Sequence, residues 1–253
     1  MIITTTNRKG GVGKTSVAGN IAQEIAKKHT TLLIDADPQG SLSEWLVTTT
    51  EKGPHHELAD VLFEKVTAME VCFQLGERLY ILPTFSDGTL WSYTEQRATS
   101  EPFAMADLFE KLSERFDYII VDLPPGLHTF EQSVLAACDR ALPVLEPEAL
   151  AVGGLNDLLS DIEEIKRKRR SAVVFNWLIV NRINRSFRRH GMYLDSLANN
   201  WQGYRLFEIP QSAAVSEAQT MKLPLNQFNA NESRALPKYR EIATTLMETV
   251  VYA

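Results

Sequence analysis

The feature that most constrains this chain is a glycine-rich segment, residues 7–16, which joins a strand pattern to a helix pattern. Ile2–Thr6 is apolar and β-branched, which predicts a buried strand, and residues 16–28 carry apolar side chains at four-residue spacing, which predicts a helix. Between them the chain reads Asn-Arg-Lys-Gly-Gly-Val-Gly-Lys-Thr-Ser. Glycines allow a backbone to wrap closely around phosphate oxygens, and the N-terminus of the next helix adds partial positive charge. The segment therefore predicts a phosphate-binding loop.

The side chains of this loop indicate what it would hold. Lys14 is expected to reach the β- and γ-phosphates of a nucleotide, and the Thr15 hydroxyl is expected to bind Mg²⁺. A standard P-loop has glycine six positions before this lysine, where the present chain has Arg8. A simple glycine-rich turn is the alternative, but three glycines, two lysines and a hydroxyl residue in strand-to-helix order favour the phosphate site.

Carboxylates follow two of the predicted strands. Thr31–Asp35 ends in Asp35, with Asp37 just beyond it, and Tyr118–Asp122 ends in Asp122 after four apolar residues. A carboxylate after such a strand is the Walker B pattern, which holds Mg²⁺ through water. Asp-Pro after Ala36 is by itself typical of a turn. Its place at the end of the strand that follows the loop favours a functional role.

The rest of the chain alternates strand and helix patterns. Further strands are expected at residues 79–83, 141–145, 173–181 and 205–209, and further helices at residues 104–116, 129–137, 154–170 and 233–250. This alternation predicts an α/β fold: a single doubly wound domain over residues 1–253, with a mostly parallel twisted sheet flanked by helices, of the P-loop NTPase type. Residues 40–60 and 84–102 are the least regular and are expected to be surface insertions.

Composition excludes several classes of protein. Hydrophobic residues make up 44% and charged residues 23%, which is globular composition, and no apolar run reaches the roughly 18 residues of a membrane span. The first residues lack the layout of a secretory signal. Two cysteines, Cys72 and Cys138, are too few for a disulfide framework and favour a reducing compartment. We therefore expect a cytoplasmic protein that has no membrane partner.

Charge is unevenly distributed along the chain. Residues 165–190 hold nine cations and no acid, and subtracting these nine charges from the net −6 leaves −15 for the remainder. The nine are Lys166, Arg167, Lys168, Arg169, Arg170, Arg182, Arg185, Arg188 and Arg189. The first five end a predicted helix, where the dipole favours one or two cations, and the other four are expected in a short loop. A run of cations without acids suits sequence-independent contact with DNA phosphates, so all nine are candidate DNA-binding residues.

The loop Lys9-Gly10-Gly11-Val12-Gly13-Lys14-Thr15 resembles the deviant Walker A motif of the ParA/MinD group of P-loop ATPases. In that group the early lysine, here Lys9, crosses the interface of an ATP-bound dimer and contacts the phosphates of the partner. The resemblance extends over nearly the whole chain. It implies ATP and Mg²⁺ as cofactors and a second copy of the chain as a partner.

The resemblance also assigns roles to residues. Lys9, Lys14 and Asp37 are the implied catalytic residues; Asp37 orients the attacking water, and Asp35 lies nearer the metal ion. The implied nucleotide contacts are Lys9, Gly10, Gly11, Val12, Gly13, Lys14, Thr15, Ser16, Glu148, Asn181 and Pro210. The implied metal set is Thr15, Asp37 and Asp122. Glu148 matches a glutamate on the nucleotide side of the dimer better than Glu146 does. Asn181 matches an adenine-binding asparagine, and Pro210 begins a loop along the base; a plain strand-end turn is the alternative for each of these segments.

The cation run favours the ParA branch of this group. That branch implies a weak, Mg²⁺-dependent ATPase for segregation of plasmid or chromosomal DNA. Its ATP dimer binds DNA non-specifically, a ParB-like partner stimulates hydrolysis, and the protein is nucleoid-associated. One departure is Ala214, where some relatives carry an arginine for DNA. A MinD-like membrane-cycling ATPase is disfavoured because residues 244–253 hold no cation. A metabolic ATP-dependent ligase with the same loop would not need nine clustered cations.

Overall fold

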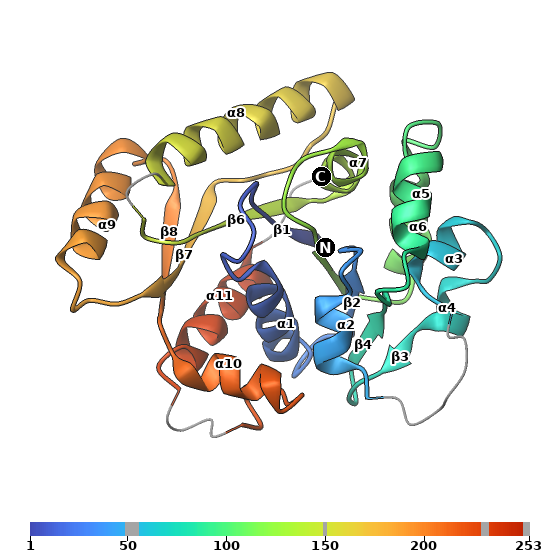
Figure 1. Cartoon of the computed structure of the whole chain (residues 1–253), viewed down its shortest axis with the longest axis horizontal. Coiled ribbons are helices and arrows are strands. Elements are labelled where there is room, and N and C mark those ends of the chain that lie inside the picture. The colour runs from blue at the N-terminus through green and yellow to red at the C-terminus, as the bar shows by residue number, and fades with distance from the viewer. Residues whose placement is uncertain (49–55, 149–150, 229–232, 250–253) are drawn as a thin grey trace.

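The computed structural model describes residues 1–48, 56–148, 151–228 and 233–249. Eight strands of these residues form one sheet in the order β3-β4-β2-β5-β1-β6-β7-β8, and only the β3–β4 pair is antiparallel (Figure 1). The strands are β1 (Ile2–Thr6), β2 (Thr31–Asp35), β3 (Phe73–Gln74), β4 (Leu79–Leu82), β5 (Tyr118–Asp122), β6 (Arg140–Leu145), β7 (Trp177–Ile183) and β8 (Arg205–Pro210). The helices are α1 (Lys14–Ile25), α2 (Ser41–Leu46), α3 (Leu58–Leu62), α4 (Ala68–Val71), α5 (Thr89–Gln96), α6 (Ala104–Ser113), α7 (Thr129–Ala137), α8 (Ala151–Arg169), α9 (Arg188–Asn200), α10 (Ala213–Thr220) and α11 (Leu236–Glu248). The expected α/β class with a mostly parallel sheet is confirmed.

Helices cover both faces of this sheet, because successive side chains of a strand point to opposite sides. Leu33 of β2 and Ile120 of β5 pack in one core with α1 and α11. Their strand neighbours Leu32 and Ile119 pack in a second core with α5, α6 and α7. A third core joins β6 and β7 to α8 and α9. Figure 1 shows α1, α10 and α11 on one side of the sheet and α7 and α8 on the other.

Two local expectations are wrong, and one strand is missing from the sequence prediction. Residues 40–60 and 84–102 contain regular structure, because α2, α3 and α5 lie there; these helices of five to eight residues are too short to show a clear helical period. The two-residue edge strand β3 has no apolar run that would predict it. The arginines after β7 do not all lie in a loop, because α9 begins at Arg188.

The strand register gathers polar side chains at one edge of the sheet. Asp35 at the end of β2 pairs with Asp122 at the end of β5, and Thr5 of β1 pairs with Asp122 from the other side. The chain enters α1 at Lys14 immediately after β1 and its loop. In open parallel sheets, ligands bind at this carboxyl edge. The fold therefore brings the predicted loop and the predicted carboxylates to one place.

Candidate nucleotide-binding site

The loop of residues 7–13 is shaped by two glycines. Gly11 and Gly13 have φ angles of 78° and 93°, which other L-residues rarely adopt. At Gly13 there is also no room for a side chain, because a Cβ atom would lie 2.2 Å from Asn181 Nδ2. These glycines let the loop close over the start of α1, whose first N–H groups have no partner within the helix. Such a helix N-terminus is an anion-binding site.

Lys14 supplies a buried positive charge at this helix start. Lys14 is only 6% exposed. It lines a cavity of about 620 Å³ together with loop glycines, Thr15 and Asp37. Burial lowers the pKa of Lys14, whereas the charges of Asp122 and Asp37 act in the opposite direction. A buried ammonium that faces an open cavity is suited to hold a phosphate group, because the missing hydration is replaced by the ligand's oxygens.

Asp122 supplies a buried carboxylate beside Lys14. Its Oδ1 accepts a hydrogen bond from the Thr5 hydroxyl at 3.3 Å, and the nearby Thr15 side chain favours the charged carboxylate. Its Oδ2 has no hydrogen-bond partner among the described residues. Burial raises the pKa of Asp122 to about 7, against the opposing effects of Thr15 and Lys14. An orphaned buried oxygen beside a hydroxyl suits a hard cation, so Thr15, Asp122 and Asp37 fit Mg²⁺.

Asp35 lies next to Asp122 but has a structural role. Its Oδ2 accepts hydrogen bonds from the backbone N–H and the hydroxyl of Ser43, each at 2.7 Å, and its Oδ1 accepts one from the Asp37 N–H at 3.3 Å. Burial raises the pKa of Asp35 well above its ordinary value. Because both oxygens are engaged, Asp35 holds α2 and the Asp37 turn in place. Asp35, which is expected nearer the metal ion, is thus occupied by contacts that support Asp37.

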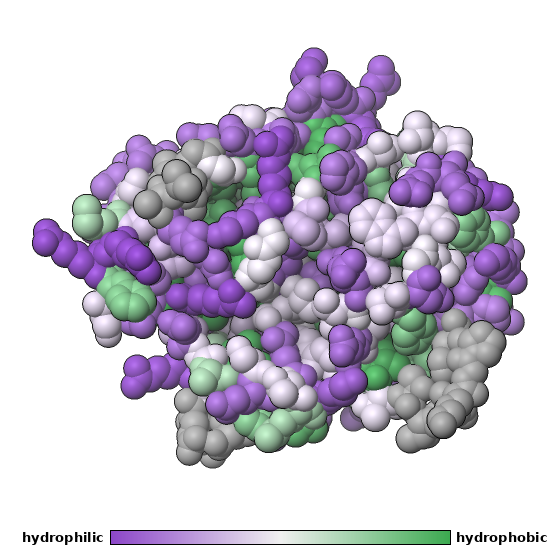
Figure 2. All heavy atoms as spheres, in the orientation of Figure 1, coloured by the Kyte–Doolittle hydropathy of each residue, from purple (hydrophilic) through white to green (hydrophobic). Residues whose placement is uncertain are grey.

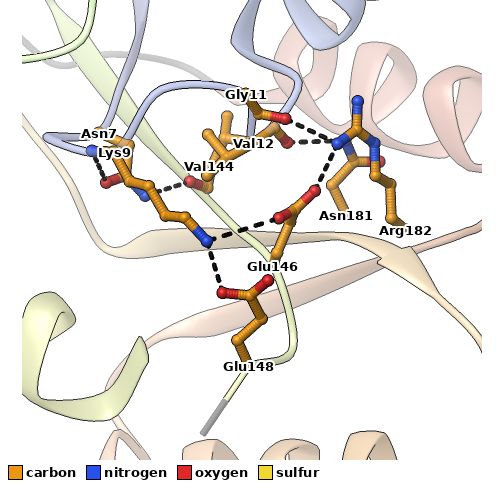
Figure 3. A network of polar contacts seen from close by, with 9 residues as sticks. All are labelled: Asn7, Lys9, Gly11, Val12, Val144, Glu146, Glu148, Asn181 and Arg182. Atoms are coloured by element: carbon orange, nitrogen blue, oxygen red, sulfur yellow. Dashed lines mark hydrogen bonds and ion pairs between the residues drawn. The ribbon is translucent and has the colours of Figure 1, made fainter. Parts of the chain in front are cut away.

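Lys9 contacts acids of its own chain. Its ammonium lies 2.5 Å from Glu148 Oε2 and 3.9 Å from Glu146 Oε2 (Figure 3). The hydrogen bond between Lys9 and Glu148 raises the pKa of the lysine and lowers that of the carboxylate. Both side chains are more than half exposed, so the pair is only weakly held. The structure thus brings Glu148 to the loop and adds Glu146 to the same network.

β7 fixes the loop from the opposite side. Asn181 Nδ2 donates to the Val12 carbonyl at 2.9 Å, and Arg182 donates to the Gly11 carbonyl at 2.7 Å and to Glu146 at 2.5 Å (Figure 3). Arg182 reaches the loop because its φ of 56° lies at an irregularity of the strand pairing. Arg182 was expected on a DNA surface, and the structure places it at the nucleotide loop instead.

The residues expected around the base lie next to the loop. Asn181 and Pro210 line a second cavity of about 340 Å³. Ser16 and Arg182 line both this cavity and the cavity in front of Lys14. The structure therefore brings both candidate base contacts to the neighbourhood of the phosphate loop.

The other basic residues do not form one surface. β6 and β7 are parallel, and α8 leads from the end of β6 back to the start of β7. The last residues of α8 therefore lie near the amino ends of these strands, whereas the end of β7 lies at the carboxyl ends. The 19 residues of α8 span about 28 Å at 1.5 Å each. Figure 1 shows α9 beside the first turns of α8 and far from its last, and Figure 2 shows hydrophilic side chains gathered at both places. The expected stripe is thus two patches: an α8 patch, residues 166–170, and an α9 patch, Arg185, Arg188 and Arg189.

Sequence reasoning missed Ser43 and the parts played by Glu146 and Arg182. A serine just inside a helix that follows a buried aspartate is a signal for Ser43, because such a hydroxyl often binds polar groups near a helix start. No signal distinguished Glu146 from Glu148, since both lie in one short run after β6. Nothing in the sequence separated Arg182 from the three arginines that follow it, so all four were assigned the same role.

Comparisons with known proteins agree with this fold. The family described as AAA domain matches residues 1–175. The chromosome partitioning protein ParA of Myxococcus xanthus is 26% identical over 254 residues, which cover 98% of this chain and 88% of that protein. The ATP complex of an McdA variant from Cyanothece has a TM-score of 0.85 at 20% identity, covering 100% of this chain and 98% of that one. MinD from Pyrococcus horikoshii with Mg-ADP has a TM-score of 0.78 at 22% identity, covering 97% and 95%. The chain belongs to the AAA domain family, in the ParA/MinD group of P-loop ATPases.

Replacing the buried carboxylate should change how stability depends on pH. Because the pKa of Asp122 in the folded chain is raised to about 7, its stabilising contribution is present below about pH 4 and is lost as pH rises through about 7. Asp122→Asn cannot ionise and escapes this loss. The free energy of unfolding of both proteins is measured in urea without nucleotide or Mg²⁺. The difference, variant minus wild type, should rise by about 1–3 kcal/mol from pH 5.5 to pH 8. An unchanged difference between the two proteins at both pH values would contradict the buried ionisation.

Proposed function

We propose that this protein is an ATPase for DNA segregation or cargo positioning, in which ATP drives a sandwich dimer that binds DNA non-specifically. The observation that carries the proposal is the different setting of the two loop lysines. Lys14 is buried in its own cavity, whereas the exposed Lys9 is held outside it by a weak ion pair. One lysine is placed for the nucleotide of its own chain, and the other can reach a nucleotide bound by a second copy.

ATP and Mg²⁺ are the cofactors of this proposal. The similar McdA and MinD structures hold ATP and Mg-ADP, which supports the same ligands here. Thr15 and Asp122 would hold the ion, with Asp37 at the rim of the same cavity. The ion would neutralise charge on the phosphates. Asp37 lines this cavity, and its N–H is bound by Asp35; in this proposal it would orient the attacking water.

The α9 patch is the proposed DNA-binding surface. Arg188 and Arg189 lie in the first turn of α9, where the helix dipole disfavours cations, so helix stability does not account for them. The charge of Arg189 helps to lower the pKa of Glu148, which places the patch next to the Lys9 network. The α8 patch lies at a helix end that favours cations, and Lys168 is paired there with Glu164 at 2.5 Å. DNA contact is therefore assigned to the α9 patch, and the α8 patch is left out of it.

Partner and location follow from the family branch. The proposal includes a ParB-like partner that stimulates a slow hydrolysis and a nucleoid-associated location, supported by the similarity to ParA. None of the helices in the described part of the chain is long and apolar enough to span a bilayer. Residues 250–253, part of the segment that holds no cation, lie outside the described residues.

Variants of Lys9 and Asp37 should separate dimerisation from hydrolysis. Lys9→Ala should bind ATP but lose the ATP-dependent dimer, because only the contact across the interface is removed. Asp37→Ala should bind ATP, dimerise and fail to hydrolyse, because water orientation is lost while Thr15 and Asp122 remain to hold the ion. Light scattering and phosphate release measure both properties. A wild-type protein that stays monomeric with ATP and Mg²⁺ would refute the sandwich.

DNA binding should require ATP and the α9 patch. Two patches on one dimer roughly double the phosphate contacts, and each contact adds about 0.9 to the slope of log affinity against log salt. Filter binding of random-sequence duplex across a salt series should therefore show tighter and steeper binding with ATP than with ADP. Reversing Arg185, Arg188 and Arg189 to Glu should abolish it while sparing the dimer.

The matched control reverses Lys168, Arg169 and Arg170 to Glu, an equal change of charge at the far end of α8. This variant should keep most of its DNA affinity. Equal affinity and equal slope in both nucleotide states would overturn the switch, and a larger loss in the control would move the DNA surface to α8.

A further inference from the structure

Arg8 is a loop residue to which the proposed function gives no role. It occupies the position of the first glycine in a standard P-loop. Its φ is not in the left-handed region, unlike those of Gly11 and Gly13, so the backbone does not require glycine there. The side chain instead reaches α8, where its Nη2 lies 2.5 Å from Asp161 Oδ2.

Three consecutive side chains of the loop contact one stretch of chain, from the end of β6 into α8. Asn7 Nδ2 donates to the Val144 carbonyl at 2.6 Å, and its Oδ1 accepts a hydrogen bond from the Lys9 N–H at 2.8 Å. Arg8 pairs with Asp161 further along this stretch, and Lys9 pairs with the glutamates between them. The start of the loop is therefore clamped on both sides of the Lys9 contact.

These contacts differ in how easily they separate. Lys9 and Glu148 are 54% and 58% exposed, so water and salt compete with their attraction. Arg8 is 52% exposed, but its partner Asp161 is only 24% exposed, and the Asn7 contact is part-buried. Lys9 can therefore leave Glu148 while the contacts of Asn7 and Arg8 remain made.

We propose that Arg8 is a positioning residue for Lys9: its ion pair with Asp161 fixes the loop against α8, so that Lys9 projects toward a second copy of this chain. The inference rests on the proposed sandwich dimer. Without the pair, the start of the loop has more conformations, and ordering it in the dimer costs conformational entropy. Because a two-fold dimer contains the pair twice, the loss counts twice.

The variants Arg8→Gln and Asp161→Asn test the pair, and the exchange Arg8→Asp with Asp161→Arg tests whether the contact itself matters. Lys168→Gln is the matched control: Lys168 lines the same cleft of about 340 Å³ but pairs with Glu164 on its own helix. Sedimentation with ATP and Mg²⁺ measures the dimer. ADP affinity, measured separately, reports on the nucleotide site of each chain.

Each single variant should raise the dissociation constant of the ATP dimer about tenfold. The loss of one ion pair weakens the dimer about threefold, and the two losses in the dimer multiply. ADP affinity should stay within about twofold, since Lys14 and its cavity are untouched. The exchange should recover most of the dimer, and the control should match wild type.

Each other outcome overturns the inference. Single variants that dimerise like a dimeric wild type, or an exchange no better than the single variants, refute the pair and leave the proposed function standing. A fall in ADP affinity as large as the fall in dimerisation shows general damage to the loop rather than positioning. A wild type that stays monomeric refutes the proposed function and this inference together.

Discussion

Burial of the Lys14 ammonium beside Asp122 is the constraint on which the rest of the site depends. Neither group is well solvated, and each has its pKa shifted by burial toward its neutral form. The cost is tolerable because each charge faces the other and because Lys14 borders a cavity that a charged ligand can fill. The glycine geometry, the strand register and the Ser43–Asp35 contacts all serve to hold these two groups in place.

The phosphate loop is also held by β6 and β7, the two strands that follow β1 in the order of the sheet. Asn181 and Arg182 of β7 bind the carbonyls of Val12 and Gly11, while Asn7 binds β6. Carbonyls engaged in this way turn away from the cavity, which leaves backbone N–H groups for phosphate. Residues separated by more than 130 positions therefore shape the same loop. The β6–α8 stretch holds the outer side of the loop, where Lys9 can exchange its partners.

Those parts of the site that depend on local chemistry were predictable from the sequence. The loop, Lys14, Thr15 and Asp122 follow from a glycine pattern and an apolar run, both of which set backbone geometry locally. The division of the cations into two patches was not predictable. Residues 170 and 182 are close in the sequence, but β7 runs between them and carries the chain across the sheet. The roles of Glu146 and Arg182 depend on the exact path of two loops, which side-chain types do not determine. The short helices α2, α3 and α5 were missed because tertiary contacts of residues such as Leu42 and Trp45 stabilise them, not their own periodicity.

The most direct test of the account is the affinity for ATP with Mg²⁺, measured by titration calorimetry on wild type and on Lys14→Ala. The account predicts that wild type binds one ATP per chain and that the variant loses at least about a hundredfold in affinity, because the buried phosphate-binding charge is gone. Circular dichroism should show that the variant keeps its fold. Unchanged ATP affinity in a folded Lys14→Ala protein would contradict the assignment of this loop as the nucleotide site.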